Sequence, residues 1–297
     1  MDYTKNEIFL EIDMNLSEAK TLLGKVPKLE RIASGFRFLE GPVWLEDEKR
    51  LIFGDISGNA LYSWTESAGV SLFRENSYLA NGNALTPSGE LISCEHATSR
   101  VTRTNLSTGS YSIVVNSYQG KALNSPNDVI VKSDGSIYFT DPLPGRQPRV
   151  GIPRPPELSF KGIYKFDDKT AFLYLLDDTF LIPNGLCFSC DETQLFVNDS
   201  ANGNILVFDV DPKGFLANKR IWGQVNGDGL GCADGMKYHP DGYIFCTGPG
   251  GIYLLSPEGK IHSRMKMPEV AANLVFADDY KTLYVTATSS LYRITLY

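Results

Sequence analysis

Apolar and polar residues alternate along the chain in a short pattern that occurs six times. Each copy is a turn followed by an alternating apolar strand that ends in a small or acidic residue. The copies read EDEKRLIFGD, PSGELISCE, SDGSIYFTD, DETQLFVND, PDGYIFCTG and DYKTLYVTA, and their first aliphatic residues are Leu51, Leu91, Ile137, Leu195, Ile244 and Leu283. These anchors lie 39 to 58 residues apart, which is the period of a four-stranded propeller blade. The pattern therefore predicts six blades.

A second strand of similar build follows every copy. These strands read NALYSW, SRVTRT, KGIYKF, GNILVF, GGIYLL and SSLYRI. Asp-Gly at 134–135 and at 241–242 is typical of tight hairpin turns, because glycine readily adopts the positive φ that such turns require. Hairpins along the whole chain indicate antiparallel sheets, so we expect an all-β, six-bladed β-propeller that forms a single domain over residues 1–297.

The two ends of the chain complement each other. The last repeat ends at Tyr297 with only its inner strands present, whereas residues 28–36 form an unpaired strand-like segment before the first repeat. We expect this segment to supply the outer strand of the last blade and to close the ring, which leaves no long unpaired edge. Residues 1–27 are expected to be an N-terminal extension, with one helix-like stretch at Leu16 to Leu23. An α/β barrel is excluded because it needs eight helices between its strands.

Residues 142–160 interrupt the repeat with a proline-rich sequence, PLPGRQPRVGIPRPPELSF. So many prolines disfavour both strand and helix, and we expect an inserted loop that covers one face of the ring. The loop could act as a lid that brings Arg146, Arg149 or Arg154 to a substrate. It could equally be a rigid surface loop with solvated arginines.

Six polar residues occupy equivalent positions ten or eleven residues before the aliphatic anchors, where the innermost strands begin. They are Glu40, Asn81, Asn127, Asn184, Asp234 and Asn273. Asn, Asp and Glu are disfavoured in strands, and inner strands line the channel of a propeller, so these side chains should form a ring at one mouth. We refer to them as the ring residues.

Two carboxylates and four carboxamides, with no histidine or cysteine, are typical of a hard-cation site of the calcium type rather than of the usual zinc site. The alternative is that these side chains only cap strand ends by binding backbone groups, which we favour for Asn81 and Asn273. It is weaker for Glu40 and Asp234, because two acids at one narrow mouth repel each other unless a cation lies between them.

The composition and charge of the chain disfavour some classes of binding partner. Hydrophobic residues make up 42% of the chain, and the formal net charge is -7 without a lysine or arginine cluster, which disfavours a nucleic-acid partner. The N-terminus lacks a basic region followed by an apolar run, and no apolar segment approaches the roughly 18 residues that span a bilayer. We therefore expect a cytoplasmic protein that does not bind membranes, while the sequence leaves the oligomeric state open.

The five cysteines are expected to be free thiols. Their number is odd, and a chain without a secretory signal stays in a reducing compartment. Cys187 and Cys190 have the spacing of a zinc or redox motif, but no second pair of ligands follows them, so strand and turn thiols are the better interpretation.

Five segments give the chain a specific resemblance. They are FLEGPVW at 38–44, CEHATSRVTR at 94–103, LNSPNDVIVKSDGSIYFTDP at 123–142, IPNGLCFS at 182–189 and CADGMKYHPDG at 232–242. In this order they resemble the family of gluconolactonases, senescence marker proteins and luciferin-regenerating enzymes, most closely its bacterial gluconolactonases. The resemblance implies a six-bladed propeller and one divalent cation bound by Glu40, Asn127, Asn184 and Asp234. Calcium is the expected ion, with zinc, magnesium and manganese as alternatives.

The resemblance also implies hydrolysis of a small-molecule lactone, with Asp234 essential as a base or as a nucleophile. His96 is a candidate for proton transfer, although a lone histidine is more often structural. Asn127, Asn81 and Arg146 are candidates for contact with the substrate. The alternatives are a phosphotriesterase or arylesterase on the same site, and a propeller that binds a cation without catalysis, since this fold serves many functions.

Overall fold

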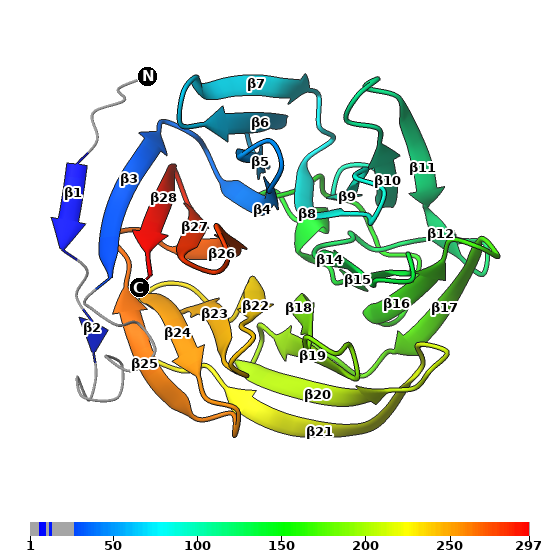
Figure 1. The fold of residues 1–297 in the computed structure, drawn as a ribbon. Helices are drawn as coiled ribbons and strands as arrows, with labels where there is room; N and C mark the ends of the chain where they lie inside the picture. The colour runs from blue at the N-terminus through cyan, green and yellow to red at the C-terminus, as the bar shows by residue number, and fades with distance from the viewer. Residues whose placement is uncertain (1–5, 10–11, 14–26, 297) are drawn as a thin grey trace.

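The computed structural model describes residues 6–9, 12–13 and 27–296, and it shows six antiparallel sheets arranged in a ring (Figure 1). The predicted six-bladed β-propeller is confirmed. In each sheet the strands follow one another from the central channel outward. Among the described residues, the only helical segment is one 3-10 turn, η1 (Pro144–Arg146).

Four consecutive strands build each of the first four blades. Blades 1 and 2 contain β4 (Leu39–Leu45), β5 (Arg50–Asp55), β6 (Ala60–Thr65) and β7 (Gly69–Glu75), then β8 (Ala80–Leu85), β9 (Leu91–Glu95), β10 (Arg100–Thr104) and β11 (Tyr111–Val115). A short hairpin of β12 (Ser117–Tyr118) and β13 (Lys121–Ala122) leads to blade 3. Blades 3 and 4 contain β14 (Val129–Val131), β15 (Ile137–Asp141), β16 (Gly162–Asp167) and β17 (Phe172–Asp177), then β18 (Pro183–Phe188), β19 (Gln194–Asp199), β20 (Asn204–Val210) and β21 (Leu216–Gln224).

The last two blades each include a segment from the N-terminal part of the chain. Blade 5 contains β22 (Met236–Tyr238), β23 (Ile244–Gly248), β24 (Gly251–Leu255) and β25 (Ile261–Lys266), with β2 (Ile12–Asp13) on its outer edge. Blade 6 contains β26 (Ala271–Ala277), β27 (Thr282–Ala287), β28 (Ser290–Thr295) and β3 (Lys28–Ser34), with β1 (Asn6–Phe9) outside β3.

The ring closes as predicted, because β3 pairs antiparallel with β28 and places Leu29 opposite Ile294. Within residues 1–27, predicted to be an N-terminal extension, the described segments β1 and β2 form fifth strands on the outer edges of two blades. The helix expected at Leu16 to Leu23 lies outside the described residues.

The hydrophobic core lies between neighbouring blades. One core cluster joins Phe53 and Trp64 of blade 1 to Tyr284 and Leu291 of blade 6. Trp44 stacks on Tyr284 with their ring centroids 5.2 Å apart. Burying one large apolar side chain contributes about 1.5–3 kcal/mol, so the contacts between blades hold the ring and its channel in one shape.

Two further findings concern the cysteines and the membrane. All five cysteines are free, with Cys187 buried and Cys190 exposed. In the part of the chain that the structure describes, no helix is long and apolar enough to cross a membrane.

Candidate functional site

The inner strands are irregular where they carry the ring residues. In blades 1, 2, 4 and 6 the pairing of the inner strand shifts register next to Glu40, Asn81, Asn184 and Asn273. In blades 3 and 5 the inner strand begins two residues after Asn127 and Asp234. A bulge or a delayed start turns side chains out of the alternating pattern of a strand, which allows all six to face one mouth.

Glycines follow four of the ring residues and bring the blades close together. A Cβ atom on any of them would lie 2.0–2.6 Å from the next ring residue, in each case against its backbone or its side-chain oxygen. These contacts pair Gly41 with Asn81, Gly82 with Asn127, Gly185 with Asp234, and Gly235 with Asn273. The ring of polar residues is therefore narrow because glycine leaves no side chain in the way.

Buried polar side chains of the second strands fix the backbone of the ring. Thr140 Oγ1 donates to Asn184 O at 2.9 Å, Thr286 Oγ1 donates to Asn273 O at 3.2 Å, and Asn198 Nδ2 donates to Asp234 O. Such bonds satisfy carbonyls that the bulges at Asn184 and Asn273, and the late start of the strand after Asp234, leave outside the sheet ladder. The ring residues thus stand on a rigid frame.

A cavity of about 210 Å³ opens at this mouth. The structure brings together Glu40, Asn81, His96, Asn127, Asn184 and Asp234 in its wall. The remaining lining residues are Phe38, Ile56, Pro144, Val150, Ile182, Ser200 and Cys232. Asn273 is not among them: its Nδ2 donates to Glu40 Oε2 at 3.0 Å, so it orients that carboxylate.

The wall of the cavity offers oxygen atoms that protein donors leave free. Glu40 Oε2 accepts from Gly41 N at 2.8 Å and from Asn273, and no described group donates to Oε1. Asn184 Nδ2 donates to Ser200 Oγ at 3.0 Å, whereas its buried Oδ1 has no partner among the described residues. An unsatisfied buried oxygen is costly, and hard oxygen donors are the ligands that calcium prefers. These residues therefore fit a hard divalent cation.

The electrostatics of the mouth agree with this fit. Burial, and then the nearby Asp128 carboxylate, raise the pKa of Glu40 to about 7. Burial also raises the pKa of Asp234 well above its usual value, and the carboxylates of Glu40 and Asp128 raise it further. The protein alone therefore disfavours the ionised form of both acids. A bound dication would stabilise the two carboxylates and lower their pKa again.

His96 occupies the cavity as a neutral, hydrogen-bonded side chain. Its Nδ1 lies 2.9 Å from Val150 O, which can only accept, so Nδ1 carries the proton. Its Nε2 lies 3.1 Å from Asn81 Nδ2 and accepts from it. Burial lowers the pKa of His96 to about 4. The imidazole therefore orients Asn81 and directs the Asn81 Oδ1 away from itself, rather than offering a free base.

The structure does not bring Arg146 into the cavity. Arg146 is buried, and its guanidinium donates to the carbonyls of Asn124, Leu123 and Pro155 at 2.5–2.7 Å. These bonds use the side chain to hold the 142–160 loop in place. The loop borders the cavity through Pro144 and Val150 instead.

Sequence reasoning missed the apolar part of the site. Phe38, Ile56 and Ile182 lie beside the ring residues in the cavity wall. Phe38 and Ile182 directly precede the inner strands β4 and β18, and Ile56 directly follows the second strand β5. The repeated pair of a polar residue followed by glycine, at 40–41, 81–82, 184–185 and 234–235, is the signal that marks the close approach of neighbouring blades.

Comparison with known proteins gives a family match over most of the chain. The model described as SMP-30/Gluconolactonase/LRE-like region matches residues 38–289. A gluconolactonase of Zymomonas mobilis is 31% identical over 290 residues, which cover 90% of this chain and 80% of the relative. A diisopropyl-fluorophosphatase of Loligo vulgaris is 26% identical over 176 residues, or 57% of this chain and 55% of the relative.

A solved structure shows the same architecture. A Xanthomonas campestris protein, described as a gluconolactonase important in glucose secondary metabolic pathways, superposes with a TM-score of 0.89 at 30% identity. The match covers 98% of this chain and 95% of that protein.

Proposed function

The chain belongs to the SMP-30/gluconolactonase/LRE-like family, and on this premise we propose that it is a lactonase that opens small sugar lactones with one divalent cation at the channel mouth. The observation that carries the proposal is the convergence of Glu40, Asn127, Asn184 and Asp234 on one cavity. One side-chain oxygen of each of two of these residues, Glu40 Oε1 and Asn184 Oδ1, has no hydrogen-bond donor among the described residues.

The proposed ligands are these four side chains, and calcium is the proposed ion, because every donor is a hard oxygen. Zinc, magnesium and manganese are the alternatives. Four protein donors leave part of the coordination of a calcium ion, which takes about six to eight oxygens, for water and substrate. When bound, the ion would polarise the lactone carbonyl and stabilise the negative charge that develops on its oxygen.

Asp234 is the residue that we propose acts on the reacting atoms. It keeps partial exposure to the cavity, whereas Glu40 is buried and receives two hydrogen bonds. A carboxylate in this position can take a proton from an attacking water, or attack the carbonyl carbon itself. Glu40 is left with a binding role.

The other polar groups of the cavity recognise the substrate. Asn81 Nδ2 donates one hydrogen to His96 Nε2, so the Asn81 Oδ1 is available to accept from a sugar hydroxyl. Asn127, a proposed cation ligand, can also contact the substrate. The cavity of about 210 Å³ is small compared with the roughly 300–1,000 Å³ of ordinary ligand pockets, which favours a compact lactone over a bulky ester.

A panel of substrates tests this assignment. We expect gluconolactone-like aldonolactones to be opened faster than aryl esters and phosphotriesters in a pH-indicator assay corrected for spontaneous hydrolysis. Preference for phosphotriesters would favour the second candidate function, which the similarity to the Loligo vulgaris enzyme supports. No turnover of any ester in the presence of saturating cation would indicate a propeller that binds a cation without catalysis.

A further inference from the structure

A larger cavity opens at the mouth of the channel opposite the candidate site. The ring residues lie where the inner strands begin, whereas this cavity is lined where β4, β22 and β26 end. Its volume is about 650 Å³, within the roughly 300–1,000 Å³ of ordinary ligand pockets. We call it the far-mouth cavity. Its lining residues are Glu46, Lys237, Tyr238, Val275, Phe276, Ala277, Asp279 and Tyr280.

Aromatic side chains form much of the wall of the far-mouth cavity. The rings of Phe276 and Tyr280 pack with their centroids 5.1 Å apart. His239 packs edge-on against both of them, at 5.6 and 5.3 Å. Tyr280 nevertheless remains 38% exposed. Rings that are held in place by packing and still present a free surface favour contact with the flat ring of a ligand.

The hairpin turn that carries Tyr280 has an unusual backbone. The inner hairpin turns of blades 1 to 5 each contain one residue with positive φ, and these are Lys49, Gly89, Gly135, Glu192 and Gly242. The turn of blade 6 contains three in succession, Asp278, Asp279 and Tyr280, with φ of 52°, 57° and 64°. Residues other than glycine adopt this conformation at a cost of about 1–2 kcal/mol each. A hairpin does not require this strain, which indicates a function for the position of Tyr280.

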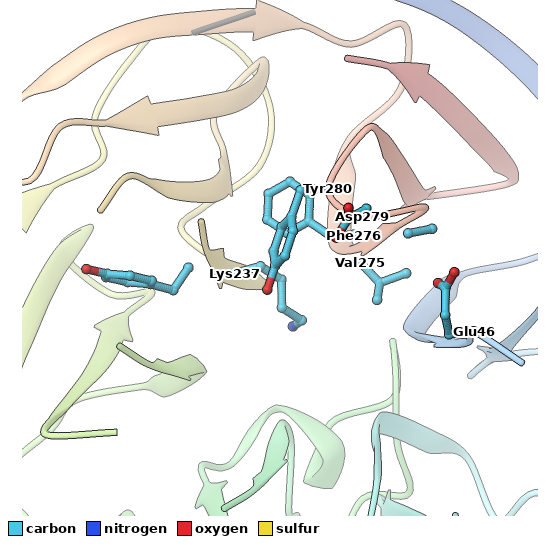
Figure 2. Close-up of a pocket in the computed structure, with 8 residues that line it drawn as sticks. Glu46, Lys237, Val275, Phe276, Asp279 and Tyr280 are labelled. Atoms are coloured by element: carbon cyan, nitrogen blue, oxygen red, sulfur yellow. The ribbon is translucent and has the colours of Figure 1, made fainter. Parts of the chain in front are cut away.

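Lys237 brings a positive charge into the far-mouth cavity. Figure 2 shows its side chain extending from β22 toward the middle of the ring. It also lines a neighbouring cavity of about 260 Å³ together with Val43 and Val275, so it lies among apolar side chains. Within the described residues its Nζ donates only to Met236 O, at 3.2 Å, which leaves ammonium hydrogens free for a ligand. Apolar surroundings strengthen the attraction of this charge for an anion.

The two acids of the cavity wall do not take up this charge. Glu46 accepts from Trp44 Nε1 at 2.6 Å and pairs with Lys49. Asp279 is exposed in its turn, where water and salt screen it. In the described part of the chain, neither acid forms an ion pair with Lys237. The far-mouth cavity therefore combines one available ammonium group with aromatic walls.

We propose that the far-mouth cavity is a second binding site, and that it takes small aromatic carboxylates. The carboxylate would bind Lys237, and the ring would lie against Phe276 and Tyr280. A sugar acid would match the ammonium group but not the apolar walls, and a neutral aromatic molecule would match only the walls. None of the proposed cation ligands lines this cavity, so the inference does not depend on the proposed function.

A ligand-observed NMR titration of the full chain tests the proposal with three probes. The aromatic carboxylate is 2-naphthoate, 2-naphthamide has the same shape without the charge, and gluconate has the charge without the ring. We expect 2-naphthoate to bind with a Kd of about 1 mM or lower, the affinity usual for a ligand of this size. The other two should bind at least about tenfold more weakly, since each lacks one of the two kinds of contact.

Variants of the wall assign the two contacts. Lys237→Met keeps the length of the side chain and should weaken 2-naphthoate at least about tenfold, with no change for 2-naphthamide. Lys237→Arg keeps the charge and should preserve the preference for 2-naphthoate over 2-naphthamide. Tyr280→Asn removes the ring with a residue that tolerates the left-handed conformation, and should weaken both probes. Lys260→Met removes an exposed lysine outside the cavity and should change neither.

Equal affinity of wild type for 2-naphthoate and 2-naphthamide would overturn the proposal, and this comparison needs no variant that could fail to fold. Absence of 2-naphthoate binding to wild type would overturn it as well. Asn184→Ala alters the candidate site at the other mouth and should leave 2-naphthoate binding unchanged. Loss of binding in Asn184→Ala, with binding retained in Lys237→Met, would place the ligand at the candidate site and contradict the assignment to the far mouth.

Discussion

Asp234 differs from the other proposed ligands because it is the one expected to act on the reacting atoms. We predict that Asp234→Asn lowers kcat by roughly 10² to 10⁴, the share of general-base catalysis, and that no concentration of cation restores it. Asn184→Ala removes a neutral ligand that water can replace, and Glu40→Gln removes one charge that opposes the cation. Both should lose cation affinity but recover much of their turnover at saturating cation.

The measurement is kcat together with bound metal for each variant, at a series of calcium concentrations. Asn273→Ala is the matched control, because it removes the hydrogen bond that orients Glu40 without removing a proposed ligand. If metal-saturated Asp234→Asn opens lactone within about tenfold of wild type, Asp234 is only a ligand and another group supplies the attack.

His96 gives the stability of the protein a specific pH dependence. Burial holds its pKa at about 4, below the 6.5 of a free imidazole. Between these values the unfolded chain binds a proton that the native state does not, so the free energy of unfolding falls as the pH falls through this window. We predict that wild type loses up to about 3 kcal/mol more than His96→Gln between pH 7 and pH 4.

Urea unfolding of both proteins at several pH values measures this difference. Because His96 stays neutral above pH 5, its titration should leave no mark on the pH profile of kcat between pH 6 and 8. Identical pH slopes of stability in the two proteins would mean that His96 has the same pKa in the native and in the unfolded state, and would contradict the prediction.

The irregular starts of the inner strands position the side chains that form the candidate site. Gly185 of β18 packs so closely on blade 5 that a Cβ would lie 2.1 Å from Asp234 O. We predict that Gly185→Ala pushes Asp234 away from the other ligands and lowers calcium affinity by at least about tenfold, with a stability loss of about 1–3 kcal/mol typical of overpacking.

Gly135→Ala is the matched control for Gly185→Ala. Gly135 lies in a hairpin turn with φ +91°, and a Cβ added there would meet nothing within 4 Å, so alanine costs stability through backbone strain alone. Its calcium affinity should remain that of wild type. Equal loss of calcium binding in both variants would show that the effect comes from general destabilisation.

The sequence predicted the strands and the ring residues well, because these depend on local sequence patterns. Alternation and turn chemistry located all six blades, and the equivalent positions located five residues that line the cavity, including Asp234. The pattern could not show that Asn127 and Asp234 precede their strands, because bulges depend on how neighbouring strands pair. Nor could it show that Arg146 is used by the carbonyls of its own loop and of the segment before blade 3, which is a tertiary contact without a local signal.

At the scale of the whole molecule, closure of the ring determines stability. The β3 strand closes the ring by pairing with β28, whereas β1 and β2 only extend the outer edges of two blades. We predict that a variant lacking residues 1–26 folds, keeps its calcium affinity and its activity, and loses only a few degrees of melting temperature, since it loses the short pairings of β1 with β3 and of β2 with β25.

A variant lacking residues 1–34 is the comparison for this prediction. It also loses β3 and exposes the edge of β28 with Leu291 and Ile294, and an apolar open edge favours aggregation. Gel filtration and thermal unfolding distinguish the two variants. A shorter deletion that prevents folding, or a longer deletion that leaves the melting temperature unchanged, would contradict the role given to β3.

The whole propeller, on this account, serves to hold one cation where a lactone can reach it. The most direct test is to remove all metal from the enzyme, verify its absence by elemental analysis, and titrate calcium back while following gluconolactone opening in a pH-stat. We predict that the metal-free enzyme shows only the spontaneous rate, and that activity rises with added calcium and saturates at one equivalent per chain. Full activity in the verified metal-free enzyme would contradict the account.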